Sequence, residues 1–173
     1  MGGQGSGKGT QAALLRAAGD YNYIETGALF RALPADSEIG QMIARGELVP
    51  DEKLFDLVAS KMNGDKDILF DGFPRTLAQA KWLVGFAKDA TLKVFYFNIP
   101  KDVMLARIQK RLNEGAGRAD DADTAAVQKR LDSFFEKTMP AIEFFKNEPQ
   151  VQFFDIDAMP SPQEIFETVE SKL

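Results

Sequence analysis

The sequence predicts an α/β fold in which a parallel sheet is covered by helices on both faces. Short runs rich in aromatic and β-branched residues alternate along the chain with longer amphipathic stretches. Strands that alternate with helices form parallel sheets, because each helix carries the chain back across a face of the sheet. The length of 173 residues suits one domain, and we expect a single domain over residues 1–173.

Four runs are predicted strands, each short, apolar or aromatic, and bounded by polar or turn-forming residues. They cover residues 22–25, 67–70, 92–99 and 151–156. The second run, Ile68-Leu69-Phe70 with its preceding aspartate, stops at Asp71-Gly72, a pair typical of a turn.

Seven stretches have apolar residues at helical spacing and are predicted helices. They cover residues 8–18, 37–45, 51–62, 76–87, 101–113, 123–147 and 162–172. Asp51 is the expected cap of the third helix, whose buried face consists of Leu54, Leu57 and Val58. In the last helix, Ser161-Pro162 places proline at the first helical position. The interval 113–123 is the most loop-like part of the chain.

Composition excludes several classes of protein. The chain has neither Cys nor His, so it lacks disulfides, a thiolate nucleophile, cysteine-ligated zinc and the commonest general base. Its 21 Lys and Arg against 26 Asp and Glu give a net charge of −5, which argues against a uniformly basic nucleic-acid surface. Apolar runs are too short for a membrane span, and the glycine-rich start is not a secretory signal. We therefore expect a cytoplasmic monomer with no membrane or nucleic-acid partner.

The most informative segment is the glycine-rich start. Four glycines within the six positions from Gly2 to Gly7 allow successive backbone N–H groups to converge on one point, an anion-binding nest. Lys8 then opens a helix with an apolar face, which argues against a flexible tail and adds charge to the positive end of the helix dipole. The spacing fits the phosphate-binding P-loop, with Gly9 at the usual Ser/Thr position and Thr10 after it.

With Lys-Gly-Thr at this place, the chain resembles the nucleoside monophosphate kinases, and further motifs follow in that family's order. They are Thr26-Gly27-Ala28-Leu29-Phe30-Arg31, Gly46-Glu47-Leu48-Val49-Pro50-Asp51, Asp71-Gly72-Phe73-Pro74-Arg75-Thr76 with Gln79, Arg107-x-x-x-Arg111, Gly117-Arg118-Ala119-Asp120-Asp121 and Lys129-Arg130-Leu131. They extend from Gly2 to about Pro160. The resemblance implies a P-loop doubly wound sheet, a helical monophosphate-binding insertion at residues 26–55 and a short lid at residues 112–122, without an inserted β domain.

The resemblance also implies a reaction, the reversible Mg²⁺-dependent transfer of a phosphoryl group from ATP to AMP. The implied ATP-binding residues are Gly3, Gly5, Ser6, Gly7, Lys8, Gly9, Thr10 and Arg107. The implied AMP-binding residues are Thr26, Arg31, Leu48, Val49, Gly72, Arg75 and Gln79. Lys8, Arg75, Arg111, Arg118 and Arg130 would be catalytic, and Asp71 would hold Mg²⁺ through water.

Electrostatics explains why such a site needs many fixed cations. Two like charges 4 Å apart repel by roughly 4 kcal/mol at an effective dielectric constant of about 20, and two nucleotides bring several such pairs together. The planar fork of arginine pairs with two phosphate oxygens at once. Phosphoryl transfer then proceeds by positioning and charge stabilisation, so no histidine is required. Because Gly9 lacks a hydroxyl, phosphates and waters would supply most ligands of Mg²⁺.

The choice of nucleobase leaves an alternative open. Thr26 and Gln79 are the residue types of the adenine-selective branch of the family, whereas the pyrimidine branch usually carries Ala and Asn. A UMP/CMP kinase is therefore the runner-up. Three departures from the family pattern bear on the site: Gln4 replaces a proline, Ala28 replaces an aspartate, and the segment 32–40 is short.

The start of the chain predicts a defect. In the family a strand leads into the P-loop from the middle of the sheet, but only Met1 precedes Gly2. Such a strand of ~5–6 apolar residues would contribute roughly 6–15 kcal/mol, comparable with the stability of a whole domain. We therefore expect a chain that starts too late, with an empty or substituted slot between the strands 67–70 and 92–99. A nucleotide-binding module without turnover is the corresponding alternative function.

Overall fold

Two parallel strand pairs organise the computed structural model, which describes residues 1–44, 50–62, 64–115 and 124–173. The chain forms two compact units. Unit 1 contains Met1–Leu15 and Pro74–Leu173, and unit 2 contains Arg16–Phe73. Within the described ranges, no helix has the length and apolar character needed to cross a membrane.

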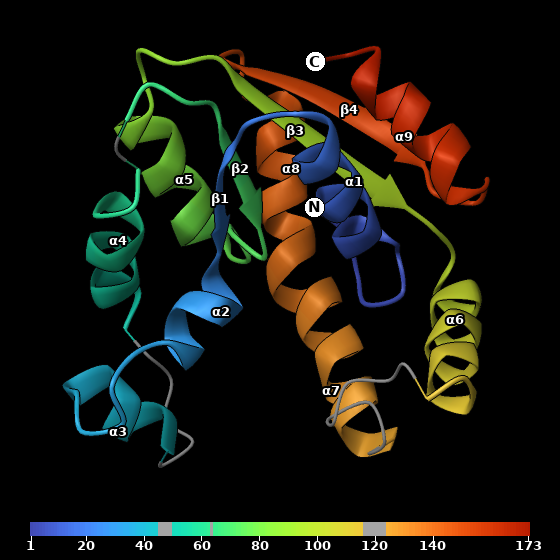
Figure 1. The fold of residues 1–173 in the computed structure, drawn as a ribbon, viewed down its shortest axis with the longest axis horizontal. Coiled ribbons are helices and arrows are strands. Elements are labelled where there is room, and N and C mark those ends of the chain that lie inside the picture. Colours follow the sequence, from blue (N-terminus) through green and yellow to red (C-terminus); the bar gives the residue numbers. More distant parts are fainter. Residues whose placement is uncertain (45–49, 63, 116–123) are drawn as a thin grey trace. The chain divides into compact units, whose positions relative to one another are not determined.

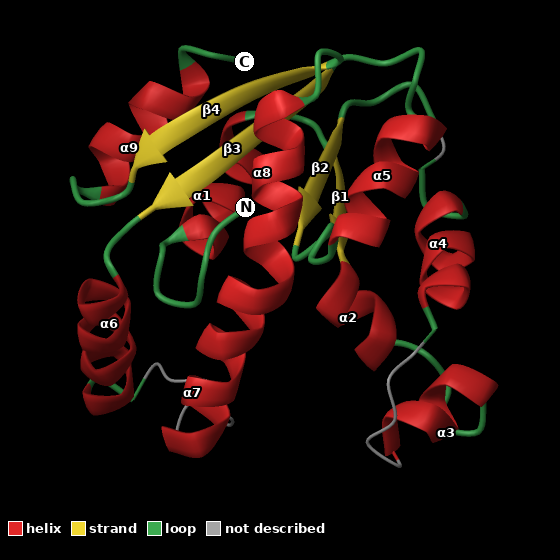
Figure 2. Ribbon diagram, turned by 180° about the vertical axis from the view of Figure 1, so that it is seen from behind, coloured by secondary structure: helices red, strands yellow, loops and turns green. Residues whose placement is uncertain are grey.

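Unit 1 is built on β3 (Leu92–Asn98) and β4 (Val151–Asp157), which pair in parallel with Leu92 opposite Val151. Helices α1 (Lys8–Ala18) and α9 (Pro162–Glu170) lie on one face of this pair and α8 (Met139–Asn147) on the other (Figures 1 and 2). Phe95 and Phe154 stack across the two strands with ring centroids 5.1 Å apart. Because both faces are covered, the strands carry the apolar runs seen in the sequence.

A long helical run follows α5 (Leu77–Phe86) and α6 (Lys101–Asn113) in unit 1. It consists of α7 (Thr124–Ser133), a π-helical turn η2 (Phe134–Thr138) and α8. The sequence predicts one regular helix here, and the π-turn is the departure. Pro140 explains it, because proline lacks an N–H group and its ring excludes the carbonyl four residues earlier. In the widened turn, the Met139 N–H bonds to the Phe134 carbonyl, five residues back.

Unit 2 is built on β1 (Asn22–Glu25) and β2 (Ile68–Asp71), paired in parallel with Asn22 opposite Ile68. Its helices are α2 (Thr26–Arg31), α3 (Glu38–Ala44) and α4 (Asp51–Ala59). Helix α2 is absent from the predicted elements. The predicted cap of α4 is also wrong, since Pro50 is the N-cap and Asp51 the first helical residue. At that position the Asp51 carboxylate interacts favourably with the positive end of the α4 dipole.

The strands were predicted to form one sheet, whereas the described strands form two sheets of two strands each. Strands β2 and β3, expected on either side of a slot, belong to different sheets. Met1 takes a position on the ladder beside β3. Its amino group donates to the Phe95 carbonyl, and the Phe97 N–H donates to the Met1 carbonyl at 2.9 Å.

Candidate nucleotide site

The glycine-rich start forms a tight loop against α6. Gly5 and Gly7 have φ values of +84° and +86°, which residues with side chains rarely adopt. A Cβ atom on Gly5 would lie 2.6 Å from the Met104 carbonyl oxygen. The Ser6 N–H closes the turn by donating to the Gly3 carbonyl at 3.2 Å, and Ser6 is buried. The loop is therefore a built structure in contact with α6, and the flexible-tail interpretation is wrong.

Lys8 is the first residue of α1, directly after the loop. Its Nζ atom lies 3.5 Å from the Gly3 carbonyl oxygen, so the ammonium group folds back over the loop. The first turn of α1 has no acidic residue that would oppose an incoming phosphate. One turn later, the buried Gln11 donates from Nε2 to the Pro162 carbonyl at 2.9 Å, which fixes α1 against the start of α9. Gly9 and Thr10 are exposed.

At the end of β2, Asp71 accepts a hydrogen bond from Tyr23, a residue outside the sequence motifs. The Tyr23 hydroxyl donates to Asp71 Oδ2 at 3.2 Å. The pKa of Tyr23 is raised to about 12, mainly by burial of the phenol and secondly by the negative charge of Asp71. The Arg16 guanidinium carbon lies 4.3 Å from the centre of the Tyr23 ring. The carboxylate predicted to act on Mg²⁺ is therefore oriented by a phenol that remains a proton donor at neutral pH.

Two residues predicted to bind AMP are in contact in unit 2. Thr26 is buried, and its Oγ1 donates to the Gly72 carbonyl at 3.0 Å. Gly72 has a φ of +79°, which a residue with a side chain would adopt only with strain. This bond ties the start of α2 to the turn that follows β2.

The motif that begins with Asp71-Gly72 continues into unit 1 from Pro74 onward. Thr76 is the N-cap of α5 and accepts from the Gln79 N–H at 3.2 Å. The Gln79 side chain is 7% exposed, and its Oε1 accepts from the Arg75 N–H at 2.8 Å. The structure thus shows a structural contact for the Gln79 amide oxygen, and its predicted contact with a nucleobase stays a prediction.

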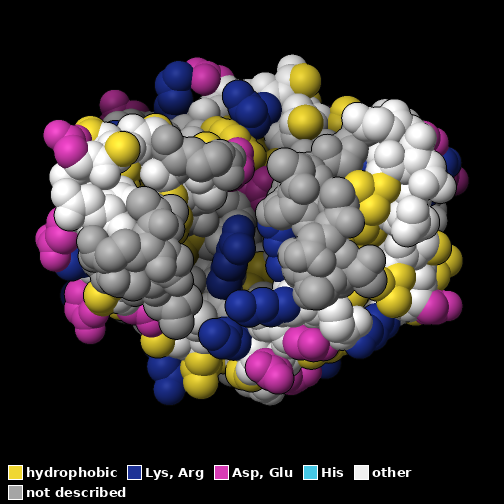
Figure 3. Space-filling model, turned by 90° about the horizontal axis from the view of Figure 1, so that it is seen from below, with side chains coloured by type: hydrophobic (Ala, Val, Ile, Leu, Met, Phe, Trp, Pro, Cys, Tyr) yellow, Lys and Arg dark blue, Asp and Glu magenta, His cyan; other side chains and the backbone are white. Residues whose placement is uncertain are grey.

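Helices α6 and α7 carry three of the predicted arginines. Arg107 donates from Nη2 to the Met159 carbonyl at 3.3 Å, beside the loop that joins β4 to α9. Arg111 is one turn further along α6, and Arg130 is on α7; both are half-buried. Lys and Arg side chains gather on the face seen from below (Figure 3). Among its described residues, unit 1 contains Lys8 and four of the predicted arginines, namely Arg75, Arg107, Arg111 and Arg130.

Four further predicted site residues are Arg31, Leu48, Val49 and Arg118. Arg31 is the last residue of α2. Leu48, Val49 and Arg118 lie outside the described residues, as does most of the predicted lid at residues 112–122.

Comparison with known proteins decides the family. The sequence model of the adenylate kinase family matches residues 1–150. The chain belongs to the adenylate kinase family. An adenylate kinase from Bacteroides thetaiotaomicron is 37% identical over 164 aligned positions, covering 88% of this chain and 85% of the relative. One from Parvibaculum lavamentivorans is 36% identical over 188 positions, covering 100% of this chain and 89% of the relative.

Membership of the adenylate kinase family confirms the P-loop α/β fold predicted from the sequence. It also confirms that the chain is an enzyme of the kinase class, with nucleotides as substrates. The motifs that carried the resemblance lie in the matched residues.

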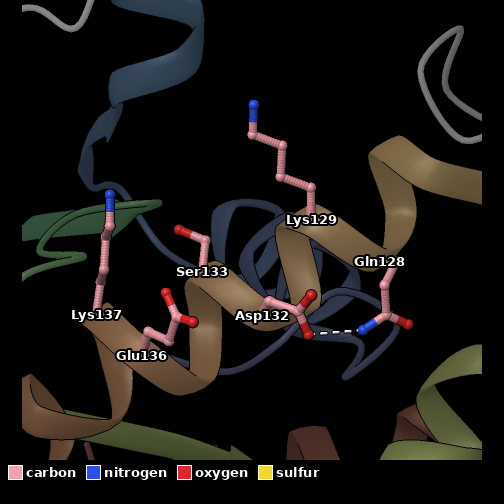
Figure 4. A pocket seen from close by; sticks show the side chains of 6 residues that line it. All are labelled: Gln128, Lys129, Asp132, Ser133, Glu136 and Lys137. Carbon is pink, nitrogen blue, oxygen red and sulfur yellow. Dashed lines mark hydrogen bonds between the residues drawn. The ribbon is translucent and has the colours of Figure 1, made fainter.

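A hollow on α7 and η2 has a different character from a nucleotide site. It encloses about 430 Å³ and is lined by Gln128, Lys129, Asp132, Ser133, Glu136 and Lys137 (Figure 4). Gln128 Nε2 donates to Asp132 Oδ1 at 2.6 Å within this lining. Two lysines balance two carboxylates, so the lining offers no net field for a phosphate. None of the six residues is a predicted site residue.

The donors present suit a family that uses Mg²⁺. Within the described ranges, no three acidic side chains converge into a protein-made metal cage. Mg²⁺ dehydrates reluctantly and is commonly held by one or two carboxylates, waters and substrate phosphates. A single oriented carboxylate, Asp71 with its Tyr23 partner, fits that mode of binding.

Proposed function

We propose that this chain transfers the terminal phosphoryl group of ATP to AMP, reversibly, giving two ADP. The observation that carries the proposal is the glycine loop built against Met104, with Lys8 at the start of α1. Loop N–H groups and the Lys8 ammonium would hold the ATP phosphates, because a helix N-terminus and a lysine both favour anions. The family of the chain supports the same reaction.

The arginines would neutralise charge as the phosphoryl group moves. Arg31 and Arg75 would hold the phosphate of AMP, and Arg111, Arg118 and Arg130 would bind the transferring group. An oxygen of the AMP phosphate attacks the γ-phosphorus of ATP, and the bond from that phosphorus to the β–γ bridging oxygen breaks. No proton needs to move for this exchange, so positioning and electrostatics suffice. Arg107 would stack on the adenine of ATP.

Asp71 would act on the metal through water. When bound with ATP, Mg²⁺ supplies neutralisation of phosphate charge. The hydrogen bond from Tyr23 fixes one oxygen of Asp71, and the carboxylate held in this way would accept hydrogen bonds from waters on the ion.

AMP is the proposed acceptor because Thr26 and Gln79 are the residue types of the adenine-selective branch. A glutamine amide offers both a donor and an acceptor, which pair with the edge of adenine. A UMP/CMP kinase is the alternative, and a binding module without turnover is the alternative from another class. A monomeric state and the cytoplasm stay predictions.

A coupled assay of ADP formation tests these proposals. Purified protein with ATP and Mg²⁺ should convert AMP much faster than CMP or UMP. Faster conversion of CMP or UMP would assign the chain to the pyrimidine branch. Binding of ATP and AMP by calorimetry without AMP-dependent ADP formation would support the module and overturn the proposed enzyme.

A further inference from the structure

Both polar groups of the Arg75 main chain, the N–H and the carbonyl, form hydrogen bonds with side chains. Its N–H donates to Gln79 Oε1 at 2.8 Å, and its carbonyl accepts from Thr138 Oγ1 at 2.9 Å. Gln79 is buried and itself fixed by the cap of α5, while Pro74 restricts the backbone immediately before Arg75. The peptide that carries the Arg75 side chain is therefore joined to two different helices.

The bond from Thr138 comes from a residue of the π-turn. In a regular helix, a threonine hydroxyl commonly donates to the carbonyl four residues earlier. For Thr138 that carbonyl belongs to Phe134, and here it accepts from the Met139 N–H. The Thr138 hydroxyl instead donates to Arg75, 63 residues away in the sequence. Thr138, two residues before Pro140, thus makes a long-range contact from within the π-turn.

The run that contains Thr138 also carries Arg130, eight residues earlier. The Thr138 hydroxyl therefore joins the helical run that carries Arg130 to the main chain of Arg75. Both arginines are proposed phosphate ligands. In phosphoryl transfer such groups must be placed accurately, because a displacement of about 1 Å costs up to 10²-fold in rate.

We propose that Thr138 is a positioning residue that sets the place of Arg75 relative to the helix carrying Arg130. This inference rests on the proposed function, in which both arginines act on phosphate. Thr138 itself need not touch a nucleotide. Removing its hydroxyl should therefore affect AMP more than ATP, since Arg75 is the proposed ligand of AMP.

Thr138→Val tests the proposal, because valine keeps the shape of threonine and lacks the donor. We expect kcat/KM for AMP to fall by about 2- to 13-fold, the equivalent of ~0.5–1.5 kcal/mol for one hydrogen bond. The KM for ATP should stay within about twofold. Thr138→Ser keeps the hydroxyl and should restore AMP kinetics to within about twofold of the unsubstituted protein.

Thr168→Val is a matched control. The Thr168 hydroxyl donates at 2.9 Å to the Glu164 carbonyl, four residues back on α9, so this variant loses a hydroxyl bond of similar length that does not involve Arg75. It should leave AMP kinetics unchanged. In an Arg75→Ala background, Thr138→Val should cause no further loss, because the residue through which it acts is gone.

Several results would overturn the inference: normal AMP kinetics in Thr138→Val, an equal defect in Thr138→Ser, or a loss that adds fully to that of Arg75→Ala. The AMP dissociation constant from calorimetry keeps the two proposals apart. If the unsubstituted protein turns over AMP and Thr138→Val has normal AMP kinetics, the inference alone is rejected and the proposed function stands. If the unsubstituted protein binds AMP without turnover, the proposed function fails, and weaker AMP binding in Thr138→Val still supports the inference. A protein that does not bind AMP would overturn both.

Discussion

Lys8 lies in the glycine loop and at the start of α1, with its Nζ 3.5 Å from the Gly3 carbonyl oxygen. Its side chain is not part of the buried core. We therefore expect Lys8→Ala to lower ADP formation by about 10²–10³-fold, the usual effect of removing one preorganised electrostatic contact. The unfolding midpoint should change little.

Lys110→Ala is the control for Lys8→Ala. Lys110 is an exposed residue of α6 whose amino group is 3.8 Å from Glu114 Oε1, an ion pair of little energetic value. Its turnover should match that of the unsubstituted protein. Near-normal turnover in Lys8→Ala would reject the assignment of the phosphate loop.

Tyr23 gives a prediction about alkaline stability. Its folded pKa of about 12 exceeds its ordinary value of 10.0, so the neutral phenol stabilises the fold fully below pH 10. That stabilisation is lost as the pH rises through 12. Tyr23→Phe removes the titration, so the difference in unfolding free energy between the two proteins should shrink above pH 10.

Denaturant unfolding at several pH values from 8 to about 11 measures this difference. Tyr96, whose pKa burial and Asp155 also raise, is present in both proteins and cancels in the subtraction. A difference that stays constant across the whole range would contradict the raised pKa of Tyr23.

At this scale, local spacing predicted some residues and missed others. The glycine loop and Lys8 are contiguous in the sequence, so their geometry follows from a short stretch of backbone. Tyr23 and Thr138 were missed because their partners, Asp71 and Arg75, are 48 and 63 residues away. No periodicity reports such a contact, although Pro140 inside a helical pattern does signal an irregular turn nearby.

Among the elements, α9 offers a test of helix capping. Ser161 accepts from the Glu164 N–H at 3.3 Å, and Glu164 Oε2 accepts from the Ser161 N–H at 2.9 Å, a reciprocal capping box. Ser161→Ala should lower the free energy of unfolding by about 1 kcal/mol at neutral pH. Thermal or urea unfolding measures the change.

Acid should reduce the effect of Ser161→Ala. The hydrogen bonds from Ser161 hold the pKa of Glu164 below its ordinary value, so the stabilisation is present above that value and lost as the pH falls through the folded pKa. Ser171→Ala is the control, because its hydroxyl donates to the Thr168 carbonyl after the helix ends and forms no such box. Equal losses in the two variants at every pH would contradict the capping role.

The local pattern predicted the bounds of some elements and missed those of others. Helices α1 and α6 have the bounds that the sequence predicted, and the start of α9 follows from Ser161-Pro162. Helix α2 was missed because its six residues, which include a glycine, are too few to show a helical period. Strand β2 is displaced by one residue and ends with Asp71 instead of Phe70.

For the whole molecule, pairing between distant strands is what the sequence could not predict. A pattern of alternating strands and helices indicates parallel pairing, which both sheets show, but it does not say which strand lies beside which. The predicted site residues are consequently divided between the units. Lys8, Arg75 and Arg111 belong to unit 1, and Thr26 and Asp71 belong to unit 2.

This division leads to a prediction about ligand-induced stability. A ligand that binds only the folded protein stabilises it by about 2.7 kcal/mol at 100 times its dissociation constant. For a protein of this size, that corresponds to a rise of roughly 5–10 °C in the unfolding midpoint. We expect such a rise with a bisubstrate analogue in which two adenosines are joined by five phosphates. At the same concentration, Lys8→Ala should lose most of it.

Amide hydrogen exchange with the separate nucleotides shows where each one binds. ATP should slow exchange in the glycine loop of unit 1, and AMP should slow exchange at Thr26 and Gly72 in unit 2, because bound phosphates and bases restrict the backbone that contacts them. A nucleotide-free sample in matched salt sets the baseline, since screening by added ions also changes stability. A rise in midpoint without protection at Thr26 and Gly72 would mean that AMP is held by other residues than those proposed.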